Sequence, residues 1–470
     1  MAFFKRGASK KKGVVAKKKS KKSADLPTKR QKKPTDDVEI SSDSDAISDN
    51  VDELSDDEVF EDAQAKSFRE AKRVLADLKK GDDGREDEGE ELDEDLNAIS
   101  HRLKLDAVQQ TTKSHRRIAD KVVINDDVVA NYRAHRFSPV CVALSKDCRY
   151  VVSCSKDGSI VKYDLKLNKK VGSIVHVKGS KNSHVGPVRA VAISGDDRYL
   201  ASGGDDKIVR IWSLETLNHV KNFAGHRAPI TSLVFRQDSN DLYSGSMDKS
   251  VRSWNLDQMG FVEIMFGHSE PISQLDMLSK QRLLSGGSSD RTLHVFKIEQ
   301  SSQLVFNGLN DCISVDTVSM INDDHYISGQ MNGSLYIWSV FKKKPVCVVQ
   351  NAHGLHEDGQ SRWICSVASL PYSDLVASGS SDGKFKLWKV SENYKTMVPV
   401  CECDIDGFIN DIRFGADGQT VALAVGQEHR MGRWFTCQEA RNSIVVLSLR
   451  SITEARQLTD ETDEPMDVAT

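Results

Sequence analysis

The sequence predicts an all-β fold in which repeated four-stranded units stack around an axis, with an extension ahead of them. Trp212, Trp254, Phe296 and Trp338 follow one another at intervals of 42 residues. Each closes a segment of one pattern: LASGGDDKIVRIW, LYSGSMDKSVRSW, LLSGGSSDRTLHVF and YISGQMNGSLYIW. Two more copies flank these four, VVSCSKDGSIVKY ending at Tyr163 and VASGSSDGKFKLW ending at Trp388. A repeat of about 40 residues is typical of architectures built by stacking one supersecondary unit.

Each copy has the pattern of a tight turn between two strands. The stretch Val209–Trp212 alternates apolar and polar residues, which predicts a half-buried strand. The Ser-Gly-x-x-Asp stretch before it predicts a turn, because Asp can bond its own backbone and Gly accepts a positive φ. Four short strands cannot bury both faces of their sheet alone, so the units are expected to stack on one another.

Polar residues recur together with the aromatic residue. An Asp or Asn stands six residues before it, at Asp157, Asp206, Asp248, Asp290, Asn332 and Asp382. In four copies a His stands 22 residues before the Asp, at His135, His184, His226 and His268. Asn310 takes that place in the fifth copy, and His353 stands 29 residues before Asp382, which implies an insertion. Recurrence at one spacing favours structural hydrogen bonding over a catalytic set.

These residues resemble WD repeats, most clearly at Gly225-His226…Trp254 and Gly267-His268…Phe296. The resemblance implies a β-propeller with one four-stranded blade per 40–45 residues. It also implies a hydrogen-bonded network of His, Ser/Thr, Asp and Trp inside each blade. The residues carried over are His184, Ser202, Asp206, Trp212, His226, Ser244, Asp248, Trp254, His268, Asp290, Asp382 and Trp388. Phe296 in the fourth blade, and Asn310 and Asn332 in the fifth, should leave those networks incomplete.

The count of blades is seven, and the propeller is expected to occupy residues 119–450. The seventh blade begins near Gly407–Phe414 and has its third strand at Ser443–Leu449. No strand follows, because residues 451–470 turn polar and acidic and are expected to form a disordered tail.

The fourth strand of the seventh blade must therefore come from elsewhere in the chain. Two segments before the first blade are candidates, Lys121–Asn125 and Val128–Tyr132. Either would close the ring and remove an exposed sheet edge.

The most informative residues are those that the repeat does not need, and they lie in loops expected on one face. The loop at 425–442 has about seventeen residues where about four suffice. It carries Arg430, Arg433, Trp434 and Arg441. Arginine binds phosphate with two parallel hydrogen bonds, and an aromatic ring stacks on an unpaired base, so these four are candidate RNA-binding residues. Alternatively, Trp434 packs and the arginines pair with the loop's glutamates.

Two other loops share that face. Lys178 and Lys181 lie in a Gly/Ser-containing loop before the second blade, which is either a solvated flexible loop or a further RNA contact. The insertion at 351–363 ends in Trp363, which is expected to anchor the loop.

Residues 1–35 form a basic tail, expected to be disordered. Residues 1–33 hold fourteen Lys/Arg and one acidic residue, for a net charge of +13. Such a run predicts a nuclear import address, and a phosphate-binding arm is compatible with it. The candidate targeting residues are Lys17, Lys18, Lys19, Lys29, Arg30, Lys32 and Lys33.

Residues 36–118 form an acidic linker, with a net charge of −18 over residues 36–95. Ser42 and Ser55 have an acidic residue three positions later and are candidate phosphorylation sites. Residues 64–80 carry an apolar stripe at helical spacing, and a second such segment starts near Leu92. These segments are expected to be helical. They are either marginally stable helices that are ordered only when packed on something, or a helix that binds a partner.

Several classes of protein are excluded or disfavoured. No run of eighteen apolar residues spans a membrane, and the N-terminus lacks the apolar core of a secretory signal. Nine cysteines without a Cys-x-x-Cys motif favour free thiols over disulfides or a zinc site. No nucleophile–base pair, phosphate-binding Gly-rich loop or metal cluster lies outside the repeat. We therefore expect no enzyme activity, cofactor, metal or small-molecule substrate.

A narrower resemblance comes from the 425–442 loop followed by RNSIVVLSLR, the Ala352-His-Gly-Leu355 insertion before Trp363, and Gln303–Phe306. Over roughly Val140–Arg450 the chain is similar to the WD-repeat proteins of the U3 small nucleolar ribonucleoprotein. That resemblance implies a nucleolar protein that binds the B/C motif of the U3 RNA beside a kink-turn-binding protein, within the small-subunit processome. The alternative is a purely protein-binding nuclear WD-repeat scaffold or adaptor.

Overall fold

The computed structural model describes residues 116–124, 130–133, 135–177, 182–309, 311–356 and 358–451. Within these ranges the secondary structure is β, apart from one turn of 3-10 helix, η1 (Ala119–Lys121). The described strands form seven antiparallel sheets, which confirms the predicted all-β, seven-bladed propeller. The basic tail, the predicted helices, Ser42, Ser55, Asn310 and the C-terminal tail lie outside the described residues.

Six blades are built from four consecutive strands that run from the axis outward. Blades one to three contain β3 (Pro139–Leu144), β4 (Tyr150–Ser155), β5 (Ile160–Asp164), β6 (Lys169–Ile174), β7 (Val188–Ile193), β8 (Tyr199–Gly204), β9 (Ile208–Ser213), β10 (His219–Ala224), β11 (Ile230–Phe235), β12 (Asp241–Ser246), β13 (Ser250–Asn255) and β14 (Gly260–Phe266). Blades four to six contain β15 (Ile272–Met277), β16 (Arg282–Gly287), β17 (Thr292–Lys297), β18 (Ser302–Asn307), β19 (Val315–Met320), β20 (His325–Gln330), β21 (Leu335–Ser339), β22 (Lys342–Val349), β23 (Ile364–Ser369), β24 (Leu375–Ser380), β25 (Lys384–Val390) and β26 (Met397–Asp404).

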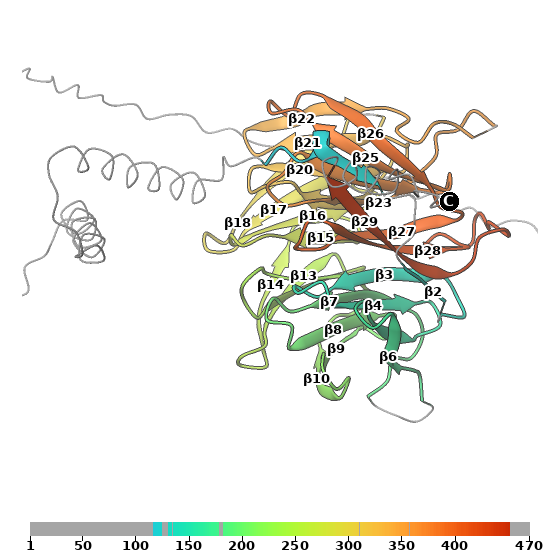
Figure 1. Ribbon diagram of the computed structural model, residues 1–470. Coiled ribbons are helices and arrows are strands. Elements are labelled where there is room, and N and C mark those ends of the chain that lie inside the picture. Colours follow the sequence, from blue (N-terminus) through green and yellow to red (C-terminus); the bar gives the residue numbers. More distant parts are fainter. Residues whose placement is uncertain are drawn as a thin grey trace, which may run out of the picture. The chain divides into compact units, whose positions relative to one another are not determined.

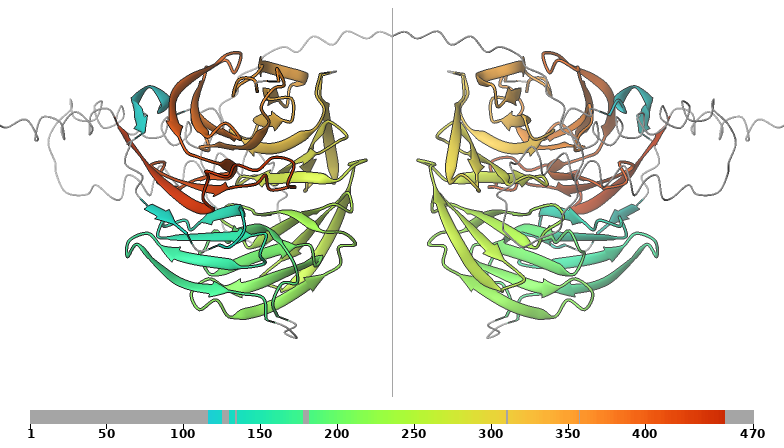
Figure 2. Two further views of the ribbon diagram at one scale, coloured as in Figure 1. Left: turned by 90° about the vertical axis from the view of Figure 1, so that its right-hand side faces the viewer. Right: turned by 90° about the vertical axis from the view of Figure 1, so that its left-hand side faces the viewer.

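Blade seven combines the two ends of the propeller. Its inner strands are β27 (Phe408–Phe414), β28 (Thr420–Gly426) and β29 (Ser443–Ser451). Two short strands pair with the outer edge of β29, so both segments proposed from the sequence contribute: β1 (Val122–Ile124) opposite Leu449–Ser451 and β2 (Ala130–Tyr132) opposite Ile444–Val446. In Figure 1 the red β28 lies directly beside the teal β3, and both views of Figure 2 place blade seven between blades one and six.

The hydrophobic core is divided among the junctions between neighbouring blades. One cluster joins Val209 and Ile211 of blade two to Leu233 and Trp254 of blade three, and similar clusters fill the other junctions. Val209–Trp212 is buried at every position, so the half-buried strand predicted there is wrong, whereas β25 keeps its three lysines partly exposed, as its alternation predicts. Blade one has a fully covered polar residue in its third strand: Lys162 is 2% exposed, and its Nζ donates to the Leu214 carbonyl at 2.8 Å.

The predicted polar residues form a complete hydrogen-bonded network in blades two, three and six, whereas in blade one His135 binds Ser159 at 2.8 Å and Ser153 at 2.7 Å. In blade three the His226 ring lies 2.9 Å from Asp248 and 2.8 Å from Ser244, and Trp254 Nε1 donates to Ser244 Oγ at 2.8 Å. The same bonds, at 2.7–2.9 Å, join His184, Asp206, Ser202 and Trp212 in blade two and His353, Asp382, Ser378 and Trp388 in blade six.

The networks of blades four and five lack some of these bonds, because blade four has Phe296 in place of the tryptophan and blade five has Asn332 in place of the aspartate. His268 binds Asp290 at 2.9 Å and Ser285 at 2.7 Å, but Phe296 has no N–H to donate. In blade five Trp338 donates to Ser328 at 2.9 Å, while Asn332 donates to the Asp311 carbonyl at 2.9 Å.

Candidate functional site

The long loop of blade seven, Gln427–Asn442, connects β28 to β29 on the face where the turns between second and third strands lie. We call this the insertion face. The base of the loop is fixed by polar side chains. Gln427 N donates to Asn442 Oδ1 at 3.0 Å, and Glu428 N donates to Ser138 Oγ at 3.1 Å. Asn410 Nδ2, which is buried at the axis, donates to the Glu428 carbonyl at 3.0 Å.

Lys156, from the corresponding turn of blade one, reaches under this loop and holds it. Its Nζ lies 3.2 Å from Glu428 Oε2 and donates to the carbonyls of His429 at 2.7 Å and Gly432 at 3.5 Å. Only 15% of the lysine side chain is exposed. Burial lowers the pKa of Lys156, and the ion pair with Glu428 opposes that shift. Because the ammonium is surrounded by oxygen atoms of the loop, it is not free to bind an external anion.

Arg430 leaves the loop toward the axis of the propeller. Its Nη2 donates to the backbone carbonyl of Asp316 in blade five, and its side chain lines the central channel with Gln274 and Arg413. Burial raises the pKa of the Asp316 carboxyl, and the nearby Arg430 guanidinium opposes that shift. Arg430 thus joins the loop of blade seven to the inner strand of blade five.

The remaining predicted RNA-binding residues of the loop point outward. Arg433 Nε donates to Glu428 at 3.0 Å, as the alternative from the sequence stated, but its side chain is 66% exposed. Trp434 is 60% exposed and Arg441 is also exposed. The four predicted residues therefore do not converge on one point. Three face solvent, and Arg430 lies at the channel.

The insertion before blade six meets this loop through aromatic rings, a contact that the sequence did not predict. The ring centroid of Trp363 lies 5.6 Å from that of His429, 5.6 Å from that of Trp434 and 6.1 Å from that of Phe435, all in edge-on arrangements. His356 stacks on Phe435 at 5.9 Å. Trp363 forms the base of an aromatic cluster shared by both insertions, and its expected role as the anchor of its own loop stays a prediction.

His429 forms the buried floor of this cluster. It is 4% exposed, and its ring lies 6.3 Å from that of Phe408 and 6.0 Å from that of Trp434. Burial, with smaller contributions from Arg430 and Lys156, lowers the pKa of His429 to about 3. The ring is therefore neutral at physiological pH and packs as an aromatic group.

Further cations surround the insertion face. Lys207, Lys249 and Arg291 follow the network aspartates of blades two to four and are exposed. They adopt φ values of 65°, 69° and 57° at the turn position where blades one, five and six have glycine. Lys178 and Lys181 lie outside the described residues, and their predicted contact with RNA stays a prediction.

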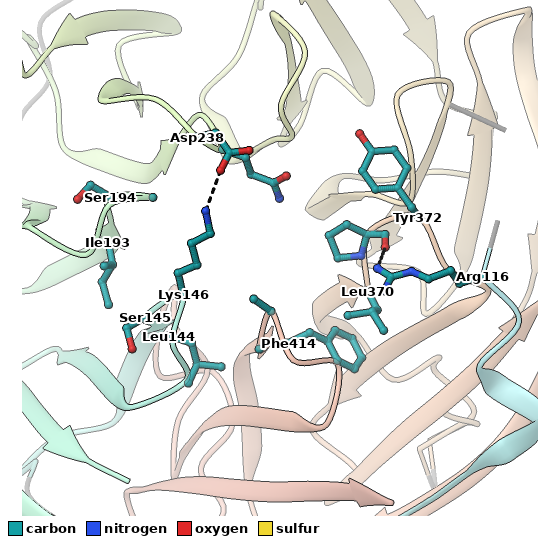
Figure 3. A pocket seen from close by; sticks show the side chains of 15 residues that line it. Arg116, Leu144, Ser145, Lys146, Ile193, Ser194, Asp238, Leu370, Tyr372 and Phe414 are labelled. Carbon is teal, nitrogen blue, oxygen red and sulfur yellow. Dashed lines mark hydrogen bonds and ion pairs between the residues drawn. The ribbon is translucent and has the colours of Figure 1, made fainter. Parts of the chain in front are cut away.

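The opposite end of the channel is a pocket of about 490 Å³ (Figure 3). Lys146 pairs with Asp238 across it at 2.8 Å, and Arg116 donates to the Pro371 carbonyl at 3.3 Å. Apolar walls come from Leu144, Ile193, Leu370, Tyr372 and Phe414. Arg116, the first described residue, therefore lies on the face opposite the two insertions.

Within the described residues, no cluster of three or more His, Cys, Asp or Glu side chains has the arrangement of a metal site. No helix in the described part of the chain is long and apolar enough to cross a membrane. The nine cysteines are free thiols, and five of them are buried.

The blades and their polar networks define a WD-repeat propeller. The family model described as "WD domain, G-beta repeat" matches residues 127–164, 176–213, 217–255 and 351–389. The U3 small nucleolar RNA-interacting protein 2 of Mus musculus is 42% identical over 400 residues, covering 83% of each chain. Ribosomal RNA-processing protein 9 of Saccharomyces cerevisiae is 27% identical, covering 75% of this chain and 79% of its own. The solved "Structure of U3-55K" superposes with a TM-score of 0.66 at 36% identity, covering 70% of this chain and 99% of that one. The chain belongs to the U3 snoRNP-associated family of WD-repeat proteins.

Proposed function

We propose that this protein is a non-catalytic component of the U3 small nucleolar ribonucleoprotein. In this role it binds the B/C motif of the U3 small nucleolar RNA together with a kink-turn-binding protein. It acts with other small-subunit processome proteins in pre-18S rRNA processing and small-subunit ribosome biogenesis. A nuclear and nucleolar location follows from that role, and the targeting lysines of the basic tail would supply the import address.

One observation carries the proposal: two insertions that a WD repeat does not need meet on one face of the ring. They present outward-pointing Arg433, Trp434 and Arg441 above a base held by Lys156 and Arg430. Exposed arginines bind backbone phosphates, and the held base lets them do so without ordering a loop on binding. The names of the relatives, one a U3 small nucleolar RNA-interacting protein and one a ribosomal RNA-processing protein, support the same choice of partner.

The test is immunoprecipitation of the tagged full chain followed by RNA sequencing. The wild-type protein should enrich the U3 RNA strongly over other small nucleolar RNAs, and a kink-turn-binding protein should be recovered with it. The double variant Arg433→Glu/Arg441→Glu should lose most of that RNA. Arg430 is left unchanged because its substitution would disturb the channel.

The matched control reverses two exposed cations on β22 of blade five, Lys342→Glu/Lys343→Glu. Equal RNA recovery by the two double variants would refute the loop as the contact. Recovery of proteins without the U3 RNA would refute the function and favour a protein-binding scaffold.

A further inference from the structure

We propose that the aromatic cluster on the insertion face is a stacking site for an unpaired nucleobase, with Trp434 as the stacking ring. This rests on the proposed function and narrows it. The RNA would be held both by its phosphates and by at least one base that is unpaired or turned out of a helix.

Trp434 and Phe435 are exposed, unlike the tryptophans of the repeat. The repeat's tryptophans, such as Trp254 and Trp338, are buried in the blades, whereas Trp434 is 60% and Phe435 is 54% exposed. Leu355, from the blade-six insertion, is 50% exposed as well. Exposed apolar side chains gathered on one face of a protein mark a binding site.

Trp434 is supported from the inside. His429 and Trp363 contact it at 6.0 Å and 5.6 Å between ring centroids. A Cβ placed on Gly432 would lie 3.0 Å from the outer edge of the indole ring, so the ring packs closely over this glycine. The position of the ring is thus set before any ligand binds, which reduces the entropy lost on binding.

The loop that carries Trp434 is also held in place. Lys156 binds two of its carbonyls, and Arg430 ties it to blade five across the channel. Glu428 and Thr436 form an isolated β-bridge, and Cys437 N donates to the Gln427 carbonyl at 2.9 Å. These contacts hold the loop, and with it Trp434, in a fixed position on the propeller.

Charge favours a nucleotide over an apolar peptide as the occupant. The Arg433 guanidinium lies 5.8 Å from the Phe137 ring centroid, and that of Arg136 lies 5.6 Å from it, on the side of blade one. The Glu428 carboxylate of the same loop is engaged by Lys156 and Arg433. A flat aromatic surface beside exposed guanidinium groups matches a base and its adjoining phosphates, and such stacking is tolerant of base identity.

The test measures binding of in vitro transcribed U3 RNA to the purified full chain, with excess transfer RNA as competitor, at several salt concentrations. Trp434→Ala should weaken binding about 5- to 100-fold, and Trp434→Phe should stay within about threefold of the wild type. Trp434→Leu should behave as Trp434→Ala, because leucine is apolar but has no ring. The dependence of affinity on salt should be unchanged in all three variants, since no phosphate contact is removed.

Phe341 provides the matched control. It is 77% exposed in the turn between β21 and β22, at the opposite end of the strands, so Phe341→Ala should leave RNA binding unchanged. Ultraviolet cross-linking of the wild-type complex is the second measurement. It should join a nucleotide to the peptide that contains Trp434 and Phe435, and it does not depend on how a variant folds.

The possible outcomes separate the two proposals. Normal binding by Trp434→Ala with no cross-link in that peptide overturns the base site, while weak binding by Arg433→Glu/Arg441→Glu still supports the proposed function. Retained binding by Trp434→Leu also overturns stacking. Loss of a protein partner, with RNA binding intact, assigns the surface to that partner. If the wild type shows no preference for U3 RNA, the proposed function fails as well.

Discussion

Replacing Asp248 with alanine tests whether the repeated polar residues hold the blades together. Its carboxylate accepts four hydrogen bonds: from His226 Nδ1 and Arg227 N, both at 2.9 Å, and from the amide and hydroxyl of Ser250 at 3.1 Å and 2.6 Å. His226 is 7% and Ser250 is 2% exposed, so water does not easily replace the lost acceptor. Leaving a buried donor unpaired costs about 1–3 kcal/mol, and with the second buried donor we expect a loss of about 2–4 kcal/mol.

The comparison is Asn332→Ala in blade five, where the sequence has Asn310 at the position of the network histidine. Asn332 donates to the Asp311 carbonyl at 2.9 Å and accepts from Ser334 N at 3.1 Å. Its loss should cost about 1 kcal/mol, as for an ordinary partly exposed hydrogen bond. The assay is thermal unfolding of the full chain, in which each kcal/mol corresponds to roughly 2 °C for a protein of this size. A shift for Asn332→Ala as large as that for Asp248→Ala would refute the account of the network.

Three further outcomes are expected. First, although burial opposes it, hydrogen bonds from His268 and Thr292 lower the pKa of Asp290 to about 2, below the unfolded value of about 3.9. Its contribution to stability is therefore complete above about pH 4 and is lost as the pH falls toward 2, which acid titration of the wild type against Asp290→Asn will show. Second, Lys156→Met should raise the hydrogen-exchange rate of residues 427–442 at least tenfold and leave the blade strands protected; equal exchange would show that the loop does not need the lysine. Third, deletion of residues 1–35 should reduce nuclear accumulation without changing the melting temperature, and unchanged nuclear levels in microscopy would place the import address elsewhere.

The blades were predictable because their residues recur. The 42-residue spacing fixed the strand positions, and the same pattern anticipated that His353 pairs with Asp382 across a longer interval, at 2.8 Å. The half-buried strand expected at Val209–Trp212 failed because the alternation of apolar and polar residues does not show which polar side chains a neighbouring blade covers. Lys162 is buried because the neighbouring blade covers it and Leu214 supplies a carbonyl.

The insertions were predictable as extra length but not as structure. Arg430 meets Asp316 and Trp363 meets Trp434 across large separations in sequence. Neither pair belongs to the repeat, so no periodicity links the partners. A single sequence shows that an arginine and a tryptophan are present in a loop. Which of the two side chains turns to the channel and which to the surface depends on how the blades are arranged around the axis.

The way in which the ring closes determines when each part of the propeller can fold during synthesis. The outer strand of blade seven consists of β1 and β2, which leave the ribosome first, while β29, their partner, leaves it last. Blades one to six can each form from consecutive residues as synthesis proceeds, but the first-made strands must wait, unpaired, for more than three hundred residues. During that interval the growing chain presents an open edge at each end of an incomplete ring. A chaperone or early partner that covers those edges would act before the last blade is synthesised.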